Sequence, residues 1–117
     1  SLKGSRILVL GAAYKKDIDD VRESPSMRLI ELLEEKGAIV AYNDPYIPLM
    51  PKMRAHKLEM ESISISKETL NSFDCAVIST DHTCYDYDFI VKESKIVVDS
   101  RNATRNVKDC REKIFLA

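Results

Sequence analysis

The stretch from Gly11 to Ser24 holds charged side chains that could bind a phosphate. It offers Lys15, Lys16 and Arg22 beside Asp17, Asp19, Asp20 and Glu23. Lysine acts toward phosphate as a mobile point charge and arginine as a planar fork, so this segment is a candidate anion site in which the acids orient the cations. A solvated loop of balanced charge is the alternative, and composition alone favours it.

A second polar cluster is the run Asp99-Ser100-Arg101-Asn102, which directly follows an apolar stretch. In one interpretation Arg101 points into a cleft at an anion. In the other, Asp99 caps a turn and Arg101 is solvated. The residues alone leave both open.

The cysteines and histidines give weaker signals. Cys75, Cys84 and Cys110 are odd in number and match no zinc or redox spacing, so we expect reduced thiols and no metal site. His56 and His82 lack a second ligand at metal spacing and are expected to be ordinary surface or loop histidines. A nucleophilic Cys84 activated by His82 is a poor hypothesis, because near neighbours on a loop rarely face each other and no third orienting group is evident.

Strands and helices alternate along the chain. We predict strands at 7–10, 39–42, 75–79, 96–99 and 114–116, a short strand within 57–65, helices at 25–36, 67–70 and 87–93, and a loop at 46–56. Ser24 and Pro25 give the first helix its N-cap and first position, and Gly37 ends it. This alternation predicts a doubly wound, mostly parallel, Rossmann-like α/β sheet whose ligands lie outside the carboxyl ends of the strands.

The turn after the first strand lacks the glycines of a dinucleotide-binding fold. It runs Gly11-Ala12-Ala13-Tyr14, with one glycine in place of the Gly-x-Gly-x-x-Gly pattern, and the helix does not begin until Pro25. A pyrophosphate therefore cannot rest on that helix start in the usual way. We expect side chains to hold any phosphate, and we do not expect NAD to bind here as it does in a Rossmann domain.

Composition narrows the function classes further. The 117 residues suit a single domain spanning 1–117, with 44% hydrophobic and 32% charged residues and a net charge of −1. This mixed charge predicts no nucleic-acid or membrane partner. No apolar run approaches the ~20 residues of a membrane span, and the start lacks the apolar stretch of a signal peptide, so we expect a cytoplasmic protein.

The sequence from Gly11 to Pro25 resembles the opening of the C-terminal, UDP-binding domain of the UDP-glucose/GDP-mannose dehydrogenase family. The resemblance continues at Tyr42-Asn43-Asp44-Pro45 and at Val98-Asp99-Ser100-Arg101-Asn102. It implies an enzyme that uses NAD to oxidise C6 of a UDP-sugar from alcohol to acid. It also implies that an N-terminal domain of the same chain binds the NAD, that the catalytic cysteine precedes this segment, and that the full enzyme is a homo-oligomer. The isolated chain is then expected to be inactive.

Carried over by position, the resemblance assigns four residues. Tyr14 and Lys15 match the aromatic–lysine pair that contacts the substrate, although the commoner residue at Tyr14 is Phe. Arg22 matches the arginine that reaches the NAD. Arg101 matches an arginine that contacts the substrate, within its own subunit or across an interface. None of the residues present matches the catalytic nucleophile.

Part of the sequence looks like the branch of the family that acts on UDP-N-acetylhexosamines, which favours UDP-N-acetylglucosamine over UDP-glucose. The resemblance lies in Thr80-Asp81-His82-Thr83, Tyr85-Asp86-Tyr87 and Ser100-Arg101-Asn102-Ala103-Thr104. The alternatives are a stand-alone ligand-sensing module and a phospho-acceptor receiver domain. A receiver needs an acidic pair directly after the first strand, where this chain has Gly11-Ala12-Ala13.

Overall fold

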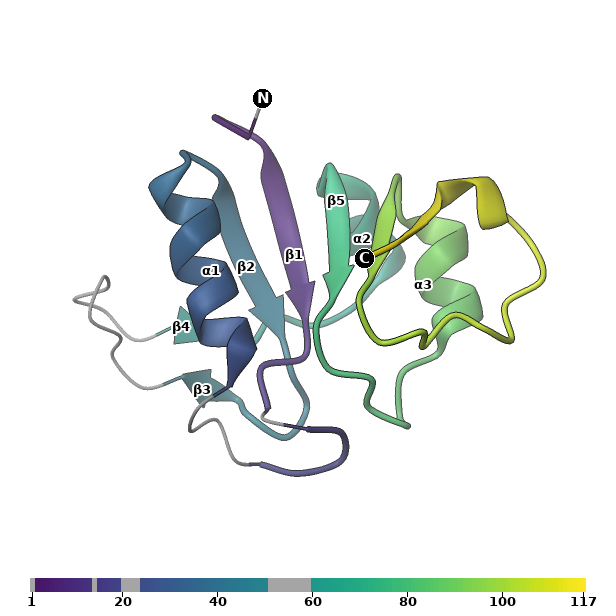
Figure 1. Ribbon diagram of the computed structural model, residues 1–117, viewed down its shortest axis with the longest axis horizontal. Coiled ribbons are helices and arrows are strands. Elements are labelled where there is room, and N and C mark those ends of the chain that lie inside the picture. Colours follow the sequence, from purple (N-terminus) through teal and green to yellow (C-terminus); the bar gives the residue numbers. More distant parts are fainter. Residues whose placement is uncertain (1, 14, 20–23, 51–59) are drawn as a thin grey trace.

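The computed structural model describes residues 2–13, 15–19, 24–50 and 60–117 (Figure 1). Its centre is a five-stranded parallel sheet with the strand order β2-β1-β5-β6-β7. The strands are β1 (Arg6–Leu10), β2 (Ile39–Asn43), β5 (Cys75–Ile78), β6 (Val97–Asp99) and β7 (Ile114–Leu116). The predicted parallel α/β sheet, including its short final strand, is confirmed.

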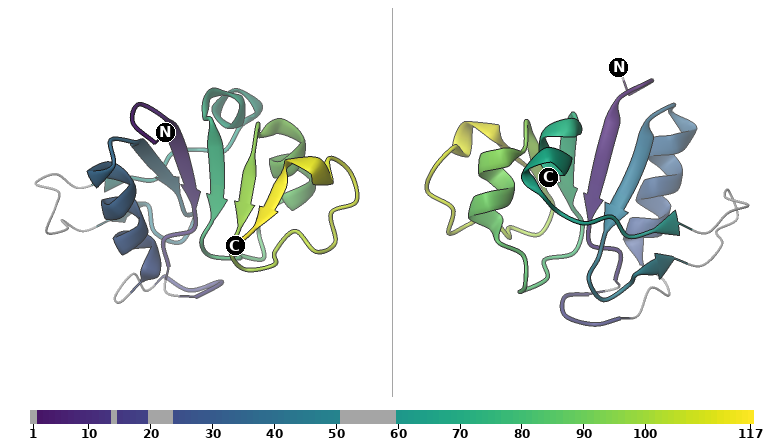
Figure 2. Two further views of the ribbon diagram at one scale, coloured as in Figure 1. Left: turned by 45° about the horizontal axis from the view of Figure 1, so that its top comes forward. Right: turned by 180° about the vertical axis from the view of Figure 1, so that it is seen from behind.

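Helices cover both faces of this sheet, as Figures 1 and 2 show. Helix α1 (Pro25–Glu35) lies over β1 and β2 on one face, while α2 (Lys67–Ser72) and α3 (Tyr87–Glu93) lie on the other, and a 3₁₀ turn, η1 (Arg111–Lys113), leads into β7. The alternation along β1 explains the two layers: Leu8 packs in the cluster with α2 and α3, and Val9 packs in the cluster with α1. Both side chains are fully buried, as a continuous apolar run in a parallel sheet requires.

Helix α1 begins and ends where its sequence predicts. The Ser24 side chain accepts a hydrogen bond from the Ser26 amide at 3.2 Å, and Pro25 occupies the first turn. Gly37 follows the helix with a φ of +89°, a backbone conformation that glycine adopts without strain. No helix in the described part of the chain is long and apolar enough to cross a membrane.

One element differs from the sequence prediction. Strands β3 (Leu49–Met50) and β4 (Met60–Glu61) form an antiparallel pair, so the predicted loop at 46–56 was wrong at Leu49–Met50, whereas a short strand within 57–65 is confirmed. Two residues are too few to show a strand period, and what fixes them is tertiary: Met50 is fully buried in the cluster under α1.

The strand order reverses at β1. The chain leaves β1 through α1 to β2 on one side, and it later returns to β5 on the other side of β1. In open parallel sheets the loops at such a switch point diverge and leave room for a ligand at the carboxyl ends of the strands. The loops after β1, β5 and β6 are therefore the place to look for a site.

Candidate functional site at the carboxyl edge of the sheet

The loops after β1 and β5 are packed directly against each other. The Thr80 hydroxyl donates a hydrogen bond to the Ala13 carbonyl at 2.9 Å, and the Ser79 and Ser26 hydroxyls lie 2.5 Å apart. Gly11 makes the close approach possible, because its φ is +94° and a side chain there would meet Thr80. The first turn of α1 and both loops thus form one hydrogen-bonded unit.

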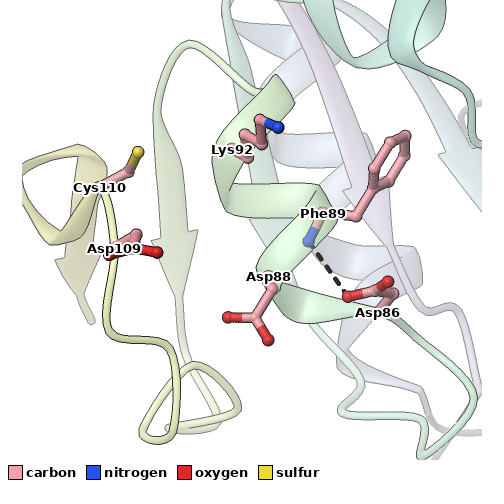
Figure 3. A pocket seen from close by; sticks show the side chains of 6 residues that line it. All are labelled: Asp86, Asp88, Phe89, Lys92, Asp109 and Cys110. Atoms are coloured by element: carbon pink, nitrogen blue, oxygen red, sulfur yellow. Dashed lines mark hydrogen bonds between the residues drawn. The ribbon is translucent and has the colours of Figure 1, made fainter.

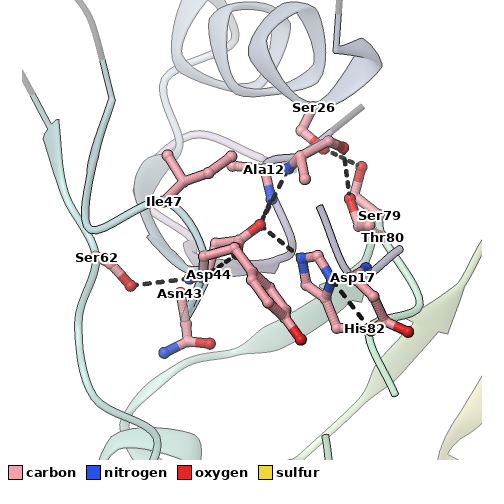
Figure 4. Close-up of polar contacts among 12 residues, drawn as sticks. Ala12, Asp17, Ser26, Asn43, Asp44, Ile47, Ser62, Ser79, Thr80 and His82 are labelled. Carbon is pink, nitrogen blue, oxygen red and sulfur yellow. Dashed lines mark hydrogen bonds and ion pairs between the residues drawn. The ribbon is translucent and has the colours of Figure 1, made fainter. Parts of the chain in front are cut away.

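Asp44, from the loop after β2, is the centre of this unit (Figure 4). Its side chain is fully buried. Oδ2 accepts the amides of Ala12 at 2.7 Å and Ala13 at 3.0 Å, while Oδ1 accepts the Tyr46 amide at 2.8 Å. A buried carboxylate is tolerated only when such donors surround it, so Asp44 and the loop after β1 fix each other.

His82, from the loop after β5, completes the network (Figure 4). Its Nε2 lies 2.8 Å from Asp44 Oδ2, and its Nδ1 accepts the Asp17 amide at 2.8 Å. The side chain has no exposed surface, so the expectation of an ordinary surface or loop histidine was wrong in its environment: His82 is in a loop but is a core residue. The buried Asp44 carboxylate supplies the partner that makes this burial possible. His56 lies outside the described residues.

Asp17 directs its carboxylate to Thr83, in the loop after β5. It adopts a φ of +61° and accepts hydrogen bonds from the Thr83 amide at 2.8 Å and the Thr83 hydroxyl at 2.5 Å. These bonds, the hydroxyl's foremost, lower the pKa of Asp17. The hydrogen bonds of this carboxylate go to Thr83, and that Asp17 orients a lysine stays a prediction. Lys15 and Lys16 are exposed, and Tyr14 and Arg22 lie outside the described residues.

The loop after β6 is built on buried Asp99. Its two oxygens accept the amides of Arg101 at 2.9 Å, Ala103 at 3.1 Å and Thr104 at 2.8 Å, and the Thr104 hydroxyl at 2.6 Å. The turn-capping interpretation of Asp99 is thus correct. Arg101 is exposed, yet its Nε donates to the Ser79 carbonyl at 3.0 Å, which holds the guanidinium at the end of β5.

Asp99 should make the fold acid-sensitive. Burial acts to raise the pKa of its carboxyl, but the hydrogen bonds from Thr104, Arg101 and Ala103 outweigh burial and hold that pKa below the ordinary value. A lowered pKa contributes stability above the unfolded pKa of ~3.9 and loses it as the pH falls through the folded pKa. Asp99→Asn should therefore cost about 1–3 kcal/mol at pH 7.

Urea unfolding of the parent chain and of Asp99→Asn at pH 7 and near pH 3 checks this, and the difference between the two proteins should shrink at the lower pH. Asp109→Asn, at an exposed position, is the matched control and should change little. A gap between parent and Asp99→Asn that stays constant with pH would contradict the account.

Two pockets differ in the charge they present. One of about 270 Å³ opens at the carboxyl edge and is lined by Lys16, Asp81, Thr83, Tyr85, Tyr87, Ala103, Arg105 and Asn106. The other, of about 530 Å³, lies beside α3 (Figure 3) and is lined by Asp86, Asp88, Phe89, Lys92, Asp109 and Cys110. Three carboxylates against one lysine would repel a phosphate, whereas two cations against one carboxylate attract it. The smaller pocket is the better candidate for an anionic ligand.

The geometry does not allow His82 to act as a base for Cys84. Both ring nitrogens of His82 are engaged elsewhere, and desolvation raises the pKa of the Cys84 thiol. A nucleophile needs the opposite arrangement. Within the described residues no group of three or more His, Cys, Asp or Glu side chains is placed to hold a metal ion.

Comparison with known proteins agrees with this arrangement of strands and loops. Residues 8–106 match the model of the UDP binding domain of the UDP-glucose/GDP-mannose dehydrogenase family. The chain belongs to this family. Among curated relatives, the UDP-N-acetyl-D-mannosamine dehydrogenase of Methanococcus vannielii is 33% identical over 87% of this chain and 24% of its own length. The UDP-glucose 6-dehydrogenase AglM of Haloferax volcanii is 32% identical over 86% of this chain and 24% of its own.

Solved structures of the same family have the same fold. An NDP-N-acetyl-D-galactosaminuronic acid dehydrogenase of Methanosarcina mazei superposes with a TM-score of 0.76 at 25% identity, over 99% of this chain and 24% of that one. The UDP-D-ManNAc dehydrogenase of Pyrococcus horikoshii gives 0.69 at 26% identity, over 97% and 25%. The chain thus spans about a quarter of the length of these relatives.

Proposed function

We propose that this chain holds the nucleotide of a UDP-sugar in an NAD-dependent UDP-sugar 6-dehydrogenase, which oxidises C6 of the sugar to the uronate. Family membership supports the reaction class. The observation that carries the site is the bond from Arg101 Nε to the Ser79 carbonyl. It keeps the guanidinium at the end of β5, where Thr80, the second residue after the strand, is hydrogen-bonded to the loop that bears Lys15.

The charges at this edge suit a pyrophosphate. Two acids of these loops have their carboxylates engaged in hydrogen bonds: Asp17 with Thr83, and Asp99 with the loop after β6. The cations Lys15 and Arg101 are exposed at the same edge. The buried Asp99 charge is compensated within its own loop while Lys15 and Arg101 face the solvent, and an anion at the switch point gains charge-assisted hydrogen bonds.

The other assignments follow from the family. We propose that Tyr14 packs on the substrate beside Lys15, and that Arg22 reaches NAD held mainly by an N-terminal domain of the same longer chain. The relatives include UDP-N-acetylhexosamine and UDP-glucose dehydrogenases. We propose UDP-N-acetylglucosamine, or a related UDP-N-acetylhexosamine, as the substrate. The single-domain boundaries, the inactivity of the isolated chain, the homo-oligomer and the cytoplasmic location stay predictions. Family membership removes the grounds for a receiver domain.

Lys15→Ala and Arg101→Ala should each weaken UDP binding by roughly 10- to 150-fold, because a charge-assisted hydrogen bond to phosphate contributes about 1.5–3 kcal/mol. Titration calorimetry of the chain with UDP measures this. Lys15→Arg should rescue only in part, since a planar fork does not replace a compact ammonium.

Lys92→Ala is the matched control, because it removes a cation from the acidic pocket beside α3 instead (Figure 3). It should leave the affinity for UDP unchanged. Parental affinity in both Lys15→Ala and Arg101→Ala would remove these residues from the site and overturn the proposal.

A further inference from the structure

We infer that His82 is a positioning residue for the nucleotide-sugar, which acts through Lys15 without touching the ligand. The inference rests on the proposed function, since it concerns the loop that carries Lys15. His82 and Asp44 together hold both ends of this loop, and neither residue is exposed.

The two attachments lie on either side of Lys15. At the near end, Asp44 Oδ2 accepts the amides of Ala12 and Ala13 at 2.7 and 3.0 Å. At the far end, His82 Nδ1 accepts the Asp17 amide at 2.8 Å. His82 Nε2 lies 2.8 Å from the same Asp44 oxygen, and this contact links the two attachments. One buried carboxylate–imidazole pair therefore holds the backbone at Ala12 and Ala13 before Lys15 and at Asp17 after it.

The hydrogen bonds select one state of the ring. A backbone amide can only donate, so Nδ1, which faces the Asp17 amide, must be unprotonated. Nε2 must then carry the proton that points to Asp44 Oδ2. The neutral Nε2–H tautomer satisfies both contacts. In the other tautomer and in the imidazolium, an N–H at Nδ1 would face the N–H of the Asp17 amide.

The His82 ring is too closely surrounded to contact a ligand or to act as a base. Its centroid lies 4.8 Å from that of Tyr46 and 5.6 Å from that of Tyr85, and the Tyr87 hydroxyl donates to the His82 carbonyl at 2.8 Å. With zero exposure and both nitrogens engaged, His82 reaches neither a ligand nor Cys84. What it determines is where the backbone places Lys15, and a displacement of about 1 Å there is enough to weaken a binding site markedly.

The test compares two replacements of His82 by UDP calorimetry on this chain. His82→Phe keeps a ring of similar size but loses both hydrogen bonds, and should weaken UDP binding by roughly 10- to 100-fold. His82→Gln can donate its amide NH₂ to Asp44 and accept from Asp17 with its oxygen, so it should stay within about threefold of the parent. Val97→Ala, in the core on the α2–α3 side, is the matched control: it should lower the melting temperature and leave the affinity unchanged.

A double-mutant cycle separates positioning from general stability. If His82 acts through Lys15, then His82→Phe should weaken UDP binding little further in a Lys15→Ala background. Should His82→Phe fail to fold, His82→Asn replaces it, because the shorter amide cannot span from Asp44 to Asp17. Additive losses, or parental affinity in the chosen variant, would overturn the inference.

A spectroscopic readout does not depend on UDP at all. Long-range ¹H–¹⁵N spectra of the parent at neutral pH should show the His82 proton on Nε2, and hydrogen exchange at the Asp17 amide should be slow in the parent and fast in His82→Phe. A parent that does not bind UDP but passes these tests would refute the proposed function alone. A proton on His82 Nδ1, or fast hydrogen exchange at the Asp17 amide of the parent, would refute the inference whether or not the parent binds UDP.

Discussion

Replacing Gly11 by alanine is expected to destabilise the chain by about 2–5 kcal/mol, the sum of a strained backbone and an overpacked contact. Its φ is +94°, and a Cβ atom would lie 2.3 Å from Thr80 Cβ and 2.7 Å from the Thr80 nitrogen. The backbone cannot retreat, because the Gly11 amide donates to Asn43 at 2.8 Å and the Thr80 amide donates to Leu10 at 3.2 Å. Urea unfolding followed by circular dichroism measures the loss.

Two other glycines separate the two causes. Gly4 has a φ of +80° with nothing near its missing Cβ, so Gly4→Ala isolates the backbone strain of about 1–2 kcal/mol. Gly37, with a φ of +89°, has Lys3 Cγ at 3.1 Å, the backbone Cα of Lys3 at 3.2 Å and Lys3 Cβ at 3.3 Å from that position, contacts that are tight but longer than those at Gly11. Gly37→Ala should thus cost more than Gly4→Ala and less than Gly11→Ala. A Gly11→Ala loss no larger than that of Gly4→Ala would show that the contact with Thr80 relaxes easily.

Asp44→Ala is expected to cost about 3–5 kcal/mol, because several buried donors lose their acceptor at about 1–3 kcal/mol each. The change leaves the buried amides of Ala12 and Ala13 without this acceptor, and His82 Nε2 loses its hydrogen-bond partner as well. Asp44→Asn should lie between parent and Asp44→Ala. Whichever way its amide is turned, the NH₂ group faces a backbone donor, either at Ala12 and Ala13 or at Tyr46.

Asp74→Ala is the matched control for Asp44. Asp74 also accepts a backbone amide, that of Arg6 at 2.8 Å, but it is exposed, so water replaces the lost acceptor and the loss should be about 0.5–1.5 kcal/mol. Unfolding by guanidinium measures the free energy of unfolding of each variant and so ranks these losses. If Asp44→Ala costs no more than Asp74→Ala, the loops at the carboxyl edge are not built on Asp44.

Local patterns in the sequence predicted the elements that are stabilised locally. The apolar run of β1 and the Ser24-Pro25 start of α1 lie where the sequence places them, because burial on both faces and helix capping need only neighbouring residues. Strand β3 was missed, since its pairing with β4 and its burial under α1 depend on distant parts of the chain.

The same distinction applies to the site. The parallel-strand rule brings the loops of Lys15 and Arg101 to one edge, and the Thr80 and Ser79 contacts link those loops. Asp44 and His82 lie 38 residues apart in sequence, and no spacing rule joins an aspartate after one strand to a histidine after another. The available signal was Asp44 in the run Tyr42-Asn43-Asp44-Pro45: a carboxylate directly after a strand lies at the ligand edge and has to be paired.

The strand order also fixes the sequence of events by which the chain can fold. β1 lies between β2, which follows it closely, and β5, which comes only after β3, β4 and α2. During synthesis, the β1–α1–β2 unit can form early, but one edge of β1 then stays unpaired until residues 75–78 have left the ribosome. Non-local parallel pairing is slow, and an open edge of Ile7, Leu8 and Val9 is prone to pair with another chain. Chains that end after β2 should therefore aggregate. In chains that extend through β5, that strand pairs with the open edge of β1.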